Sequence, residues 1–162
     1  MEKALLICGK IASGKSTYAQ MLCKKENAVL LSVDEITLKV LGGDLGEKHD
    51  AIADRTQKYL FDKSLEILRA GTSVLLDWGF WTKKKRSEAR LFYESRGIAC
   101  EFHYIDTPDD VWERNIAKRN HAVLAGETDA YLVDDGLRAK LSAAFEEPER
   151  SEIDVWHINR WG

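Results

Sequence analysis

A glycine-bounded segment near the start of the chain constrains its fold most strongly. Residues 9–16 read Gly-Lys-Ile-Ala-Ser-Gly-Lys-Ser and match the pattern GxxxxGK[ST], directly after the apolar run at residues 4–8. Such a loop needs a strand before it and a helix after it, because its peptide N–H groups and the first turn of the helix bind phosphate together. Tyr18, Met21 and Leu22 have the spacing of a helix that packs on a sheet. The segment therefore predicts a phosphate-binding loop, or P-loop, in an α/β fold.

Each fixed position of this loop has a chemical role. Glycine permits backbone conformations that are closed to other residues, Lys15 supplies a charge for the β- and γ-phosphates, and the Ser16 hydroxyl can ligate a magnesium ion. A nucleoside triphosphate such as ATP is thus the expected ligand. The residues expected to bind it are Gly9, Lys10, Ala12, Ser13, Gly14, Lys15, Ser16 and Thr17.

Length and charge narrow the remaining possibilities. A chain of 162 residues is of the size of one domain, so we expect residues 1–162 to form a single domain. The 24 basic and 27 acidic residues give a net charge of -3, which argues against strong sequence-independent binding of nucleic acid. Neither the three cysteines nor the four histidines have a metal-binding spacing. A strand begins within three residues of the start and no apolar run approaches about 20 residues, which predicts a cytoplasmic protein with no membrane partner.

Five short apolar stretches alternate with helical segments along the chain. Strands are expected at residues 3–8, 28–33, 73–77, 99–105 and 153–158. Helices are expected at about residues 15–25, 34–41, 50–70, 83–96 and 108–120, with a last one carrying Leu137, Leu141, Ala144 and Phe145. This alternation predicts a three-layer α/β fold, in which helices cover both faces of a five-stranded parallel sheet.

Aspartates stand at the expected carboxyl ends of three strands, where ligands of open parallel sheets collect. Asp77 closes the run Val-Leu-Leu-Asp, which is typical of an aspartate that helps to hold magnesium beside a P-loop. It could instead cap the next helix, although Thr82 is better placed for that role. Asp34 could accept the proton of an attacking hydroxyl group, or cap the helix that begins at residue 35, or do both. Asp106 follows the fourth strand.

Phosphoryl transfer also needs cations around the γ-phosphate. Arg114, Lys118 and Arg119 lie on or just beyond the helix that starts near Pro108, and small and polar residues follow them up to position 130. We expect a short lid at about residues 114–130 that brings arginine over the nucleotide. A solvated helix face is the alternative interpretation of these arginines.

The densest basic run is at residues 83–86. Its lysines are expected to be solvated, whereas Arg86 or Arg90 could bind a phosphate group of the substrate. Aromatic residues precede the run at positions 78, 80 and 81. They are of a kind that more often packs in a core, although at a strand end they could also hold a substrate ring.

The chain resembles the P-loop kinases of the zeta-toxin-like and polynucleotide-kinase-like group, often labelled AAA-type ATP-binding kinases. The matching segments are GKIASGKST at 9–17, SVDE at 32–35, VLLDWGFWTKKKR at 74–86, VWERNIAKRN at 111–120 and FEEPERSEIDVWHIN at 145–159. The resemblance implies a P-loop NTPase fold with strand order 2-3-1-4-5. It also implies that Asp34 activates a substrate hydroxyl and that Arg114 and Arg119 belong to the lid.

One departure from this group bears on the acceptor. Polynucleotide kinases usually carry an arginine just past the catalytic aspartate, whereas this chain has Ile36, Thr37 and Leu38 there. The difference favours a smaller acceptor than a nucleic acid. Members of the group phosphorylate sugars, nucleotides, antibiotics or nucleic-acid ends, so the resemblance alone names no acceptor.

The leading hypothesis from the sequence is an ATP- and Mg²⁺-dependent kinase that phosphorylates a hydroxyl group of a small molecule. Its expected catalytic residues are Lys15, Asp34, Arg114 and Arg119, and its expected metal ligands are Ser16 and Asp77. Two alternatives remain open: a polynucleotide 5′-hydroxyl kinase, and a nucleotide-binding switch or regulatory ATPase without an acceptor.

Overall fold

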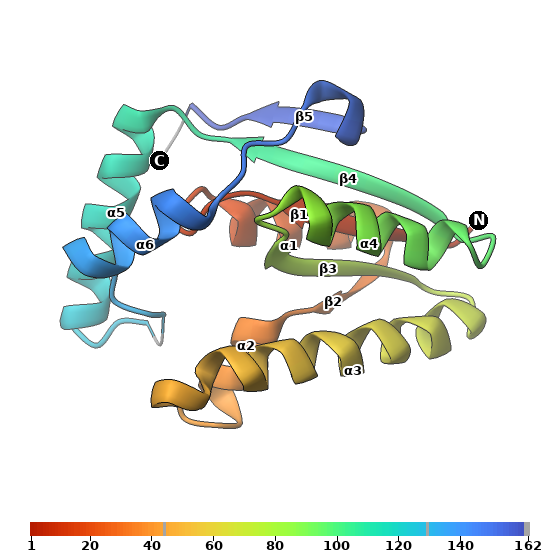
Figure 1. The fold of residues 1–162 in the computed structure, drawn as a ribbon, viewed down its shortest axis with the longest axis horizontal. Helices are drawn as coiled ribbons and strands as arrows, with labels where there is room; N and C mark the ends of the chain where they lie inside the picture. Colours follow the sequence, from red (N-terminus) through yellow and green to blue (C-terminus); the bar gives the residue numbers. More distant parts are fainter. Residues whose placement is uncertain (44, 129, 161–162) are drawn as a thin grey trace.

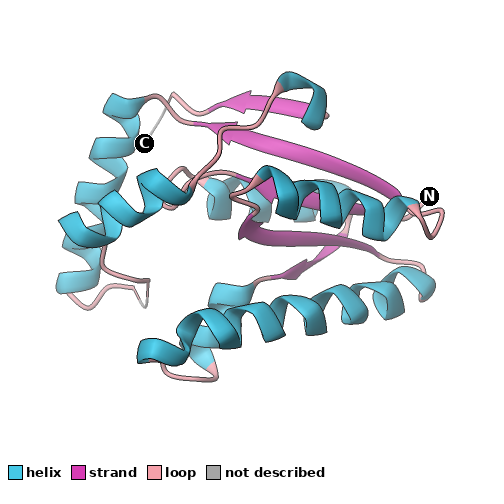
Figure 2. Ribbon diagram, viewed as in Figure 1, coloured by secondary structure: helices cyan, strands magenta, loops and turns pink. Residues whose placement is uncertain are grey.

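The computed structural model describes residues 1–43, 45–128 and 130–160, and its elements alternate between strands and helices (Figures 1 and 2). The strands are β1 (Lys3–Cys8), β2 (Ala28–Leu31), β3 (Ser73–Gly79), β4 (Ala99–Asp106) and β5 (Val155–Ile158). The α-helices are α1 (Lys15–Glu26), α2 (Val33–Lys39), α3 (His49–Arg69), α4 (Lys83–Glu94), α5 (Asp109–Leu124) and α6 (Asp135–Ala144). Two short 3-10 helices, η1 (Gly46–Lys48) and η2 (Arg150–Glu152), precede α3 and β5.

The five strands form one parallel sheet in the order β2-β3-β1-β4-β5. Both the strand number and the order implied by the family resemblance are therefore confirmed. β1 lies at the centre, paired with β3 on one side and β4 on the other. Its carboxyl end leads directly into the P-loop, so the loop lies at the middle of the edge where all five strands end.

Alternating side chains of the central strands pack on different helices. Leu5 and Ile7 of β1 lie in an apolar cluster with Ala19 and Leu22 of α1. The residues between them face the other side of the sheet, in a cluster shared with α3 and α4. Figure 1 shows α1 behind the sheet and the other two helices in front of it. Because both faces are covered, β1 is apolar throughout, which explains its unbroken hydrophobic run.

A third apolar cluster lies beside the sheet rather than on it. It is formed by Trp112 and Ile116 of α5, Val133 and Leu141, with Ile11 and Ala12 of the P-loop packed against them. The helices α5 and α6 thus have a small core of their own, and part of the phosphate-binding loop belongs to it.

The boundary between β2 and α2 differs from the predicted one in a way that bears on the site. The Ser32 side chain accepts a hydrogen bond from the Glu35 N–H and caps α2, so the helix begins at Val33 and β2 ends at Leu31. Asp34 therefore lies within the first helical turn, and the prediction that it caps the helix is wrong. An acidic side chain in that turn is still favourable, because it faces the positive end of the helix dipole.

Other boundaries move by a few residues. β3 continues to Gly79, α5 continues to Leu124, and β5 begins only at Val155. The predicted lid at residues 114–130 is therefore helical up to Leu124, and residue 129 lies outside the described residues. Within the described parts of the chain, no helix is long and apolar enough to cross a membrane.

Candidate active site

The P-loop turns sharply between the end of β1 and the start of α1. Ala12 and Gly14 adopt positive φ angles of 57° and 90°, and Gly14 occupies the N-cap position of α1. The Gly9 N–H donates to the Gly79 carbonyl at 3.1 Å, which joins the start of the loop to the end of β3. The loop conformation thus depends on residues with access to left-handed backbone angles.

Gly9 and Gly14, the two glycines of the P-loop pattern, both have neighbours that would crowd a side chain. A Cβ atom on Gly14 would lie 2.5 Å from the Asn159 Nδ2 atom, and one on Gly9 would lie 3.0 Å from the Ser13 Oγ atom. Glycine is therefore needed at position 14 for its backbone angle and for space alike.

Three side chains from outside the loop hold two of its carbonyl groups. Trp112 Nε1 donates to the Ile11 carbonyl at 2.8 Å, and the Ser13 carbonyl accepts from Thr107 Oγ1 at 2.9 Å and Asn159 Nδ2 at 2.8 Å. In a trans peptide the N–H points opposite to the C=O. Holding these carbonyls on the outer side therefore directs the next N–H groups to the inner side, as phosphate binding requires.

The Ser13 side chain gives independent evidence for a polar ligand. Ser13 is 1% exposed, and its Oγ atom is the one buried side-chain oxygen or nitrogen without a hydrogen-bond partner among the residues that the structure describes. A buried hydroxyl usually has a partner, and leaving it unpaired is costly. A phosphate oxygen held by the loop would supply an acceptor, so the loop fits the nucleotide predicted for it.

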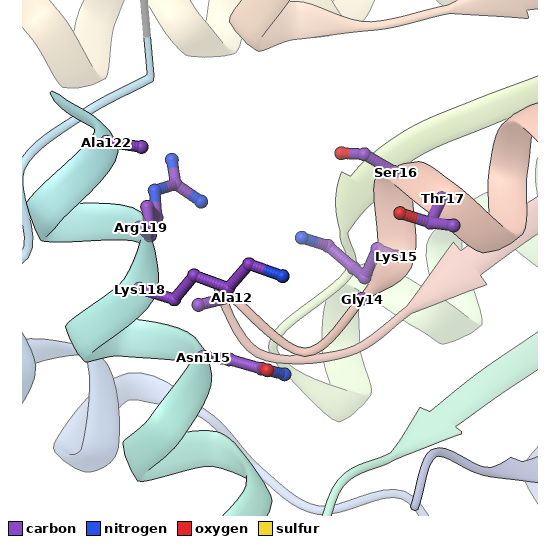
Figure 3. Close-up of a pocket in the computed structure, with 9 residues that line it drawn as sticks. All are labelled: Ala12, Gly14, Lys15, Ser16, Thr17, Asn115, Lys118, Arg119 and Ala122. Atoms are coloured by element: carbon purple, nitrogen blue, oxygen red, sulfur yellow. The ribbon is translucent and has the colours of Figure 1, made fainter. Parts of the chain in front are cut away.

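A pocket of about 310 Å³ lies between the P-loop and α5. Figure 3 shows Asn115, Lys118 and Arg119 projecting from α5 toward the loop, with Lys15 facing them from the other wall. The pocket lining is formed by Ala12, Gly14, Lys15, Ser16, Thr17, Asn115, Lys118, Arg119 and Ala122. Three of these side chains are basic, which suits a polyphosphate.

The other predicted nucleotide-binding residues lie nearby. Gly9 is buried at the start of the loop. The Lys10 Nζ atom lies 4.7 Å from the centre of the Trp112 ring. The cation–π contact gives Lys10 a role in holding α5 to the loop.

The two predicted carboxylates lie close enough to Lys15 and Arg119 to affect pKa values. Burial raises the pKa of Asp77, which is 9% exposed; Lys15 lowers this pKa and Asp34 raises it. Burial lowers the pKa of the Arg119 guanidinium, and Asp34 opposes that shift. The structure thus brings Lys15, Asp34, Asp77 and Arg119 into one electrostatic neighbourhood. Asp34 is exposed to solvent, as an acceptor-facing carboxylate would need to be.

Asp77 has no part in capping the next helix. Thr82 caps α4, since its side chain accepts from the Lys85 N–H at 3.2 Å. Across the described residues, no group of three or more His, Cys, Asp or Glu side chains could hold a metal ion. A divalent cation at Ser16 and Asp77 would therefore take its remaining ligands from water and phosphate oxygens, which suits magnesium.

The two predicted lid arginines differ in position. Arg119 lines the pocket and donates from Nε to the Tyr131 carbonyl at 3.1 Å. Arg114 has a side chain that is 64% exposed, and its contact is with Asp110, one turn earlier on α5. Arg114 is not among the pocket residues. The structure therefore brings Arg119 to the site and leaves Arg114 on the helix surface.

Arg86 and Arg90 are both engaged away from the pocket. Arg86 is 2% exposed and donates to Glu152 at 2.8 Å and to the Phe80 carbonyl at 2.9 Å. Arg90 binds Asp154 and the Glu152 carbonyl. The prediction that one of them binds a substrate phosphate is wrong, because both guanidinium groups join α4 to the segment before β5.

The aromatic residues near the end of β3 serve as packing. Phe80 is 2% exposed and stacks on Trp78 with a ring separation of 5.2 Å. Trp81 packs against the cluster formed by α5 and α6. Phe80 also has a φ angle of 43°, which is uncommon for a bulky residue. Its strained backbone is held by the Arg86 hydrogen bond to its carbonyl.

Several site residues escaped the sequence prediction. Thr107, Trp112 and Asn159 hold the loop from outside, while Asn115 and Tyr131 reach the site from α5 and from the segment after it. The positions of Thr107 and Asn159, each just after a strand, were a usable signal, because every strand ends at the same edge of the sheet as the P-loop. No local pattern marks the others.

Comparison with protein families gives one match over most of the chain. The family described as AAA domain matches residues 5–148. No curated protein matches the sequence.

Solved structures share the whole fold at low sequence identity. The APS kinase CysC of Mycobacterium tuberculosis, in complex with AMPPNP and APS, has a TM-score of 0.70 and 22% identity over 99% of this chain and 90% of that one. A gluconokinase from Sinorhizobium meliloti has a TM-score of 0.67 and 12% identity over 99% and 84%. The Pnkp1/Rnl/Hen1 RNA repair complex contains a chain with a TM-score of 0.69 and 21% identity over 88% and 43%. This fold thus occurs in proteins whose names indicate unlike acceptors, and it does not by itself select one.

Proposed function

Because the chain belongs to the AAA domain family and has the fold of P-loop kinases, we propose that it is an ATP- and Mg²⁺-dependent kinase that phosphorylates a hydroxyl group of a small molecule. The nucleotide half of this proposal rests on the P-loop and its pocket. Lys15 and the loop N–H groups would bind the β- and γ-phosphates, and Ser16 and Asp77 would hold the magnesium ion. The ion would supply charge neutralisation between the phosphate groups.

The observation that supports the acceptor half is the electrostatic effect of Asp34 on Arg119, which lines the nucleotide pocket. Asp34 comes from α2 and Arg119 from α5, and the negative charge of Asp34 opposes the burial that lowers the pKa of Arg119. An exposed carboxylate within electrostatic reach of a pocket arginine suits in-line transfer to a hydroxyl group, which needs a proton acceptor and a cation near the transferring phosphate.

The proposed reaction is a single displacement at the γ-phosphorus. Asp34 accepts the proton of the acceptor hydroxyl as its oxygen bonds to the γ-phosphorus, and the bond from that phosphorus to the bridging oxygen of ADP breaks. Lys15 and Arg119 stabilise the charge on the transferring group. The products are ADP and a phosphate monoester of the acceptor.

A transfer screen with γ-labelled ATP tests the proposal. The panel contains sugars, nucleosides, amino alcohols, antibiotics and 5′-hydroxyl oligonucleotides. With a small acceptor found, Asp34→Asn is expected to lower kcat by about 10² to 10³ while the Kd for ATP stays within about twofold. Glu35→Gln is the matched control, because Glu35 is the neighbouring exposed carboxylate of the same helical turn.

Each result of the screen separates the three candidate functions. Transfer to a 5′-hydroxyl oligonucleotide with strong salt dependence would identify a polynucleotide kinase instead. ATP binding without a phosphorylated product across the panel would favour a nucleotide-binding switch. Near-normal turnover of Asp34→Asn with the true acceptor would remove Asp34 from the role of base.

A further inference from the structure

The segment at residues 131–133, here called the strap, is fixed to α5 by its backbone. The Asn120 side chain accepts from the Val133 N–H at 2.7 Å and donates to the Val133 carbonyl at 2.6 Å. Arg119 Nε donates to the Tyr131 carbonyl at 3.1 Å. Val133 is 3% exposed within the cluster of α5 and α6. Two neighbouring residues of one helix thus hold alternate residues of the strap, which gives it a defined path.

The Tyr131 side chain extends from the strap to the opposite wall of the site. Its hydroxyl lies 2.9 Å from Thr37 Oγ1 of α2, and its ring meets the His49 ring edge-on at 5.8 Å. Thr37 Oγ1 donates its proton to the Asp34 carbonyl at 3.2 Å, so in the contact with Tyr131 it is the acceptor. Thr37 is fully buried. Tyr131 therefore donates a hydrogen bond to the helical turn that carries Asp34.

One residue consequently connects both groups proposed for the acceptor half of the reaction. The backbone of Tyr131 holds Arg119, and its side chain holds the turn that carries Asp34. The strap thereby spans the space between α5 on one side and α2 and α3 on the other. A groove that binds a polymer along its length has to be open at both ends, whereas a cleft that is spanned at its acceptor end favours a compact molecule.

We propose that Tyr131 is a specificity-determining residue that spans the acceptor end of the cleft and restricts the acceptor to a small, compact hydroxyl compound. The nature of the acceptor in this inference rests on the proposed kinase function, whereas the restricted access to Asp34 does not. It predicts a steric limit on what can reach Asp34, which labelling can measure without an acceptor.

The labelling experiment uses a cysteine at position 34 and two reagents of equal chemistry. Asp34→Cys is treated with N-ethylmaleimide or with a maleimide carried on a long polyethylene glycol. Val40→Cys is the control, because Val40 lies beyond α2 and is 73% exposed. Background labelling is expected to be low, since burial raises the pKa of Cys8 and of Cys100 to about 12 and also raises that of Cys23.

The quantity compared is the ratio of the labelling rate with the small reagent to that with the large one. This ratio is expected to be at least severalfold higher at position 34 than at position 40. Adding Tyr131→Ala is expected to remove that difference. Equal relative rates in the presence of Tyr131, or a difference that survives Tyr131→Ala, would overturn the proposal. The urea midpoint of each variant shows whether the fold is kept.

The kinetic experiment uses the small acceptor found by the transfer screen together with its own oligomers. Tyr131→Phe and Thr37→Val are expected to raise the KM for the acceptor about fivefold, with the Kd for ATP unchanged, because each removes the same hydrogen bond. Tyr131→Ala is expected to gain transfer to the oligomers. Tyr59→Phe, an exposed tyrosine on α3, is the matched control.

The two proposals fail in different ways. A wild-type protein that phosphorylates oligomers as efficiently as the small compound overturns the role of Tyr131 and leaves the kinase intact. A protein that transfers phosphate to nothing overturns the kinase function, while the labelling ratio at position 34 still decides whether Tyr131 restricts access.

Discussion

The hydrogen bonds that hold the P-loop from outside lead to a quantitative prediction for nucleotide affinity. Thr107 and Asn159 both donate to the Ser13 carbonyl, so either alone keeps that carbonyl paired. Each bond has a net worth of about 1 kcal/mol. With one of the two bonds removed, the binding-competent loop is still favoured by about 1 kcal/mol and remains the main conformer. Thr107→Val or Asn159→Ala alone is therefore expected to raise the Kd for ATP less than about twofold.

The double variant should behave differently. With both donors absent, the Ser13 carbonyl is buried and unpaired, which costs about 1 to 3 kcal/mol in the native loop and favours conformers that reach water. At about 1.4 kcal/mol in favour of those conformers the competent fraction falls to about one tenth, so the Kd rises about tenfold. The expected coupling between the two sites is therefore close to 1 kcal/mol.

Isothermal titration calorimetry with ATP, on the wild type, both single variants and the double variant, measures this coupling directly. Thr56→Val is the control, since Thr56 Oγ1 also donates to a carbonyl, that of Ile52, but within α3. The reasoning would be refuted if the change in ATP-binding free energy of the double variant equalled the sum of the two single changes. It would also be refuted if one single variant bound ATP as weakly as the double variant does. Either result would mean that the loop holds its conformation without these donors.

Two further predictions concern buried charges. Asp77→Asn is expected to raise the unfolding free energy of the nucleotide-free protein by about 1 kcal/mol, because burial disfavours the ionised carboxylate, and to weaken Mg²⁺-dependent ATP binding about tenfold. Urea unfolding and ATP titration with and without Mg²⁺ measure both effects, and a loss of stability would contradict the first. Burial raises the pKa of Glu152, but the hydrogen bond and the charge of Arg86 outweigh burial and bring this pKa below its ordinary value of 4.5. The stability that the ion pair contributes is therefore complete above pH 4.5 and is lost as the pH falls through the lowered pKa of the folded protein. Glu152→Gln should therefore lower the unfolding free energy by about 3 kcal/mol at pH 7 and by progressively less as the pH falls below 4.5, and a cost independent of pH would contradict the pairing.

Local patterns predicted the elements well because each pattern has a local cause. The P-loop, the strand before it and the helix after it follow from spacing alone, and Thr82 caps α4 as its position indicated. The strand order came from the family resemblance, since alternation of strands and helices is compatible with several orders. Asp34 follows the second strand as predicted, but the capping role considered for it belongs to Ser32, two residues earlier.

Tertiary partners account for what the sequence did not reveal. Arg86 was considered as a ligand of a substrate phosphate, yet it lies in register with Ala89 and Tyr93 on the buried stripe of α4. The spacing of these three residues indicates a buried helix face and could have predicted the burial of Arg86. Its partner Glu152 could not be predicted, because it is remote in the chain. The strap was equally hidden, because only the path of the backbone brings Tyr131 to Thr37 across 94 positions.

The shared cluster of the P-loop and α5 has a thermodynamic consequence. Since Ile11 and Ala12 pack with Trp112 and Val133, the loop and the two helices beside it cannot unfold locally without one another. Free energy released when a ligand occupies the loop is then distributed over the whole unit. Hydrogen exchange should accordingly slow throughout α5 and α6 when ATP binds, including at amides far from any phosphate.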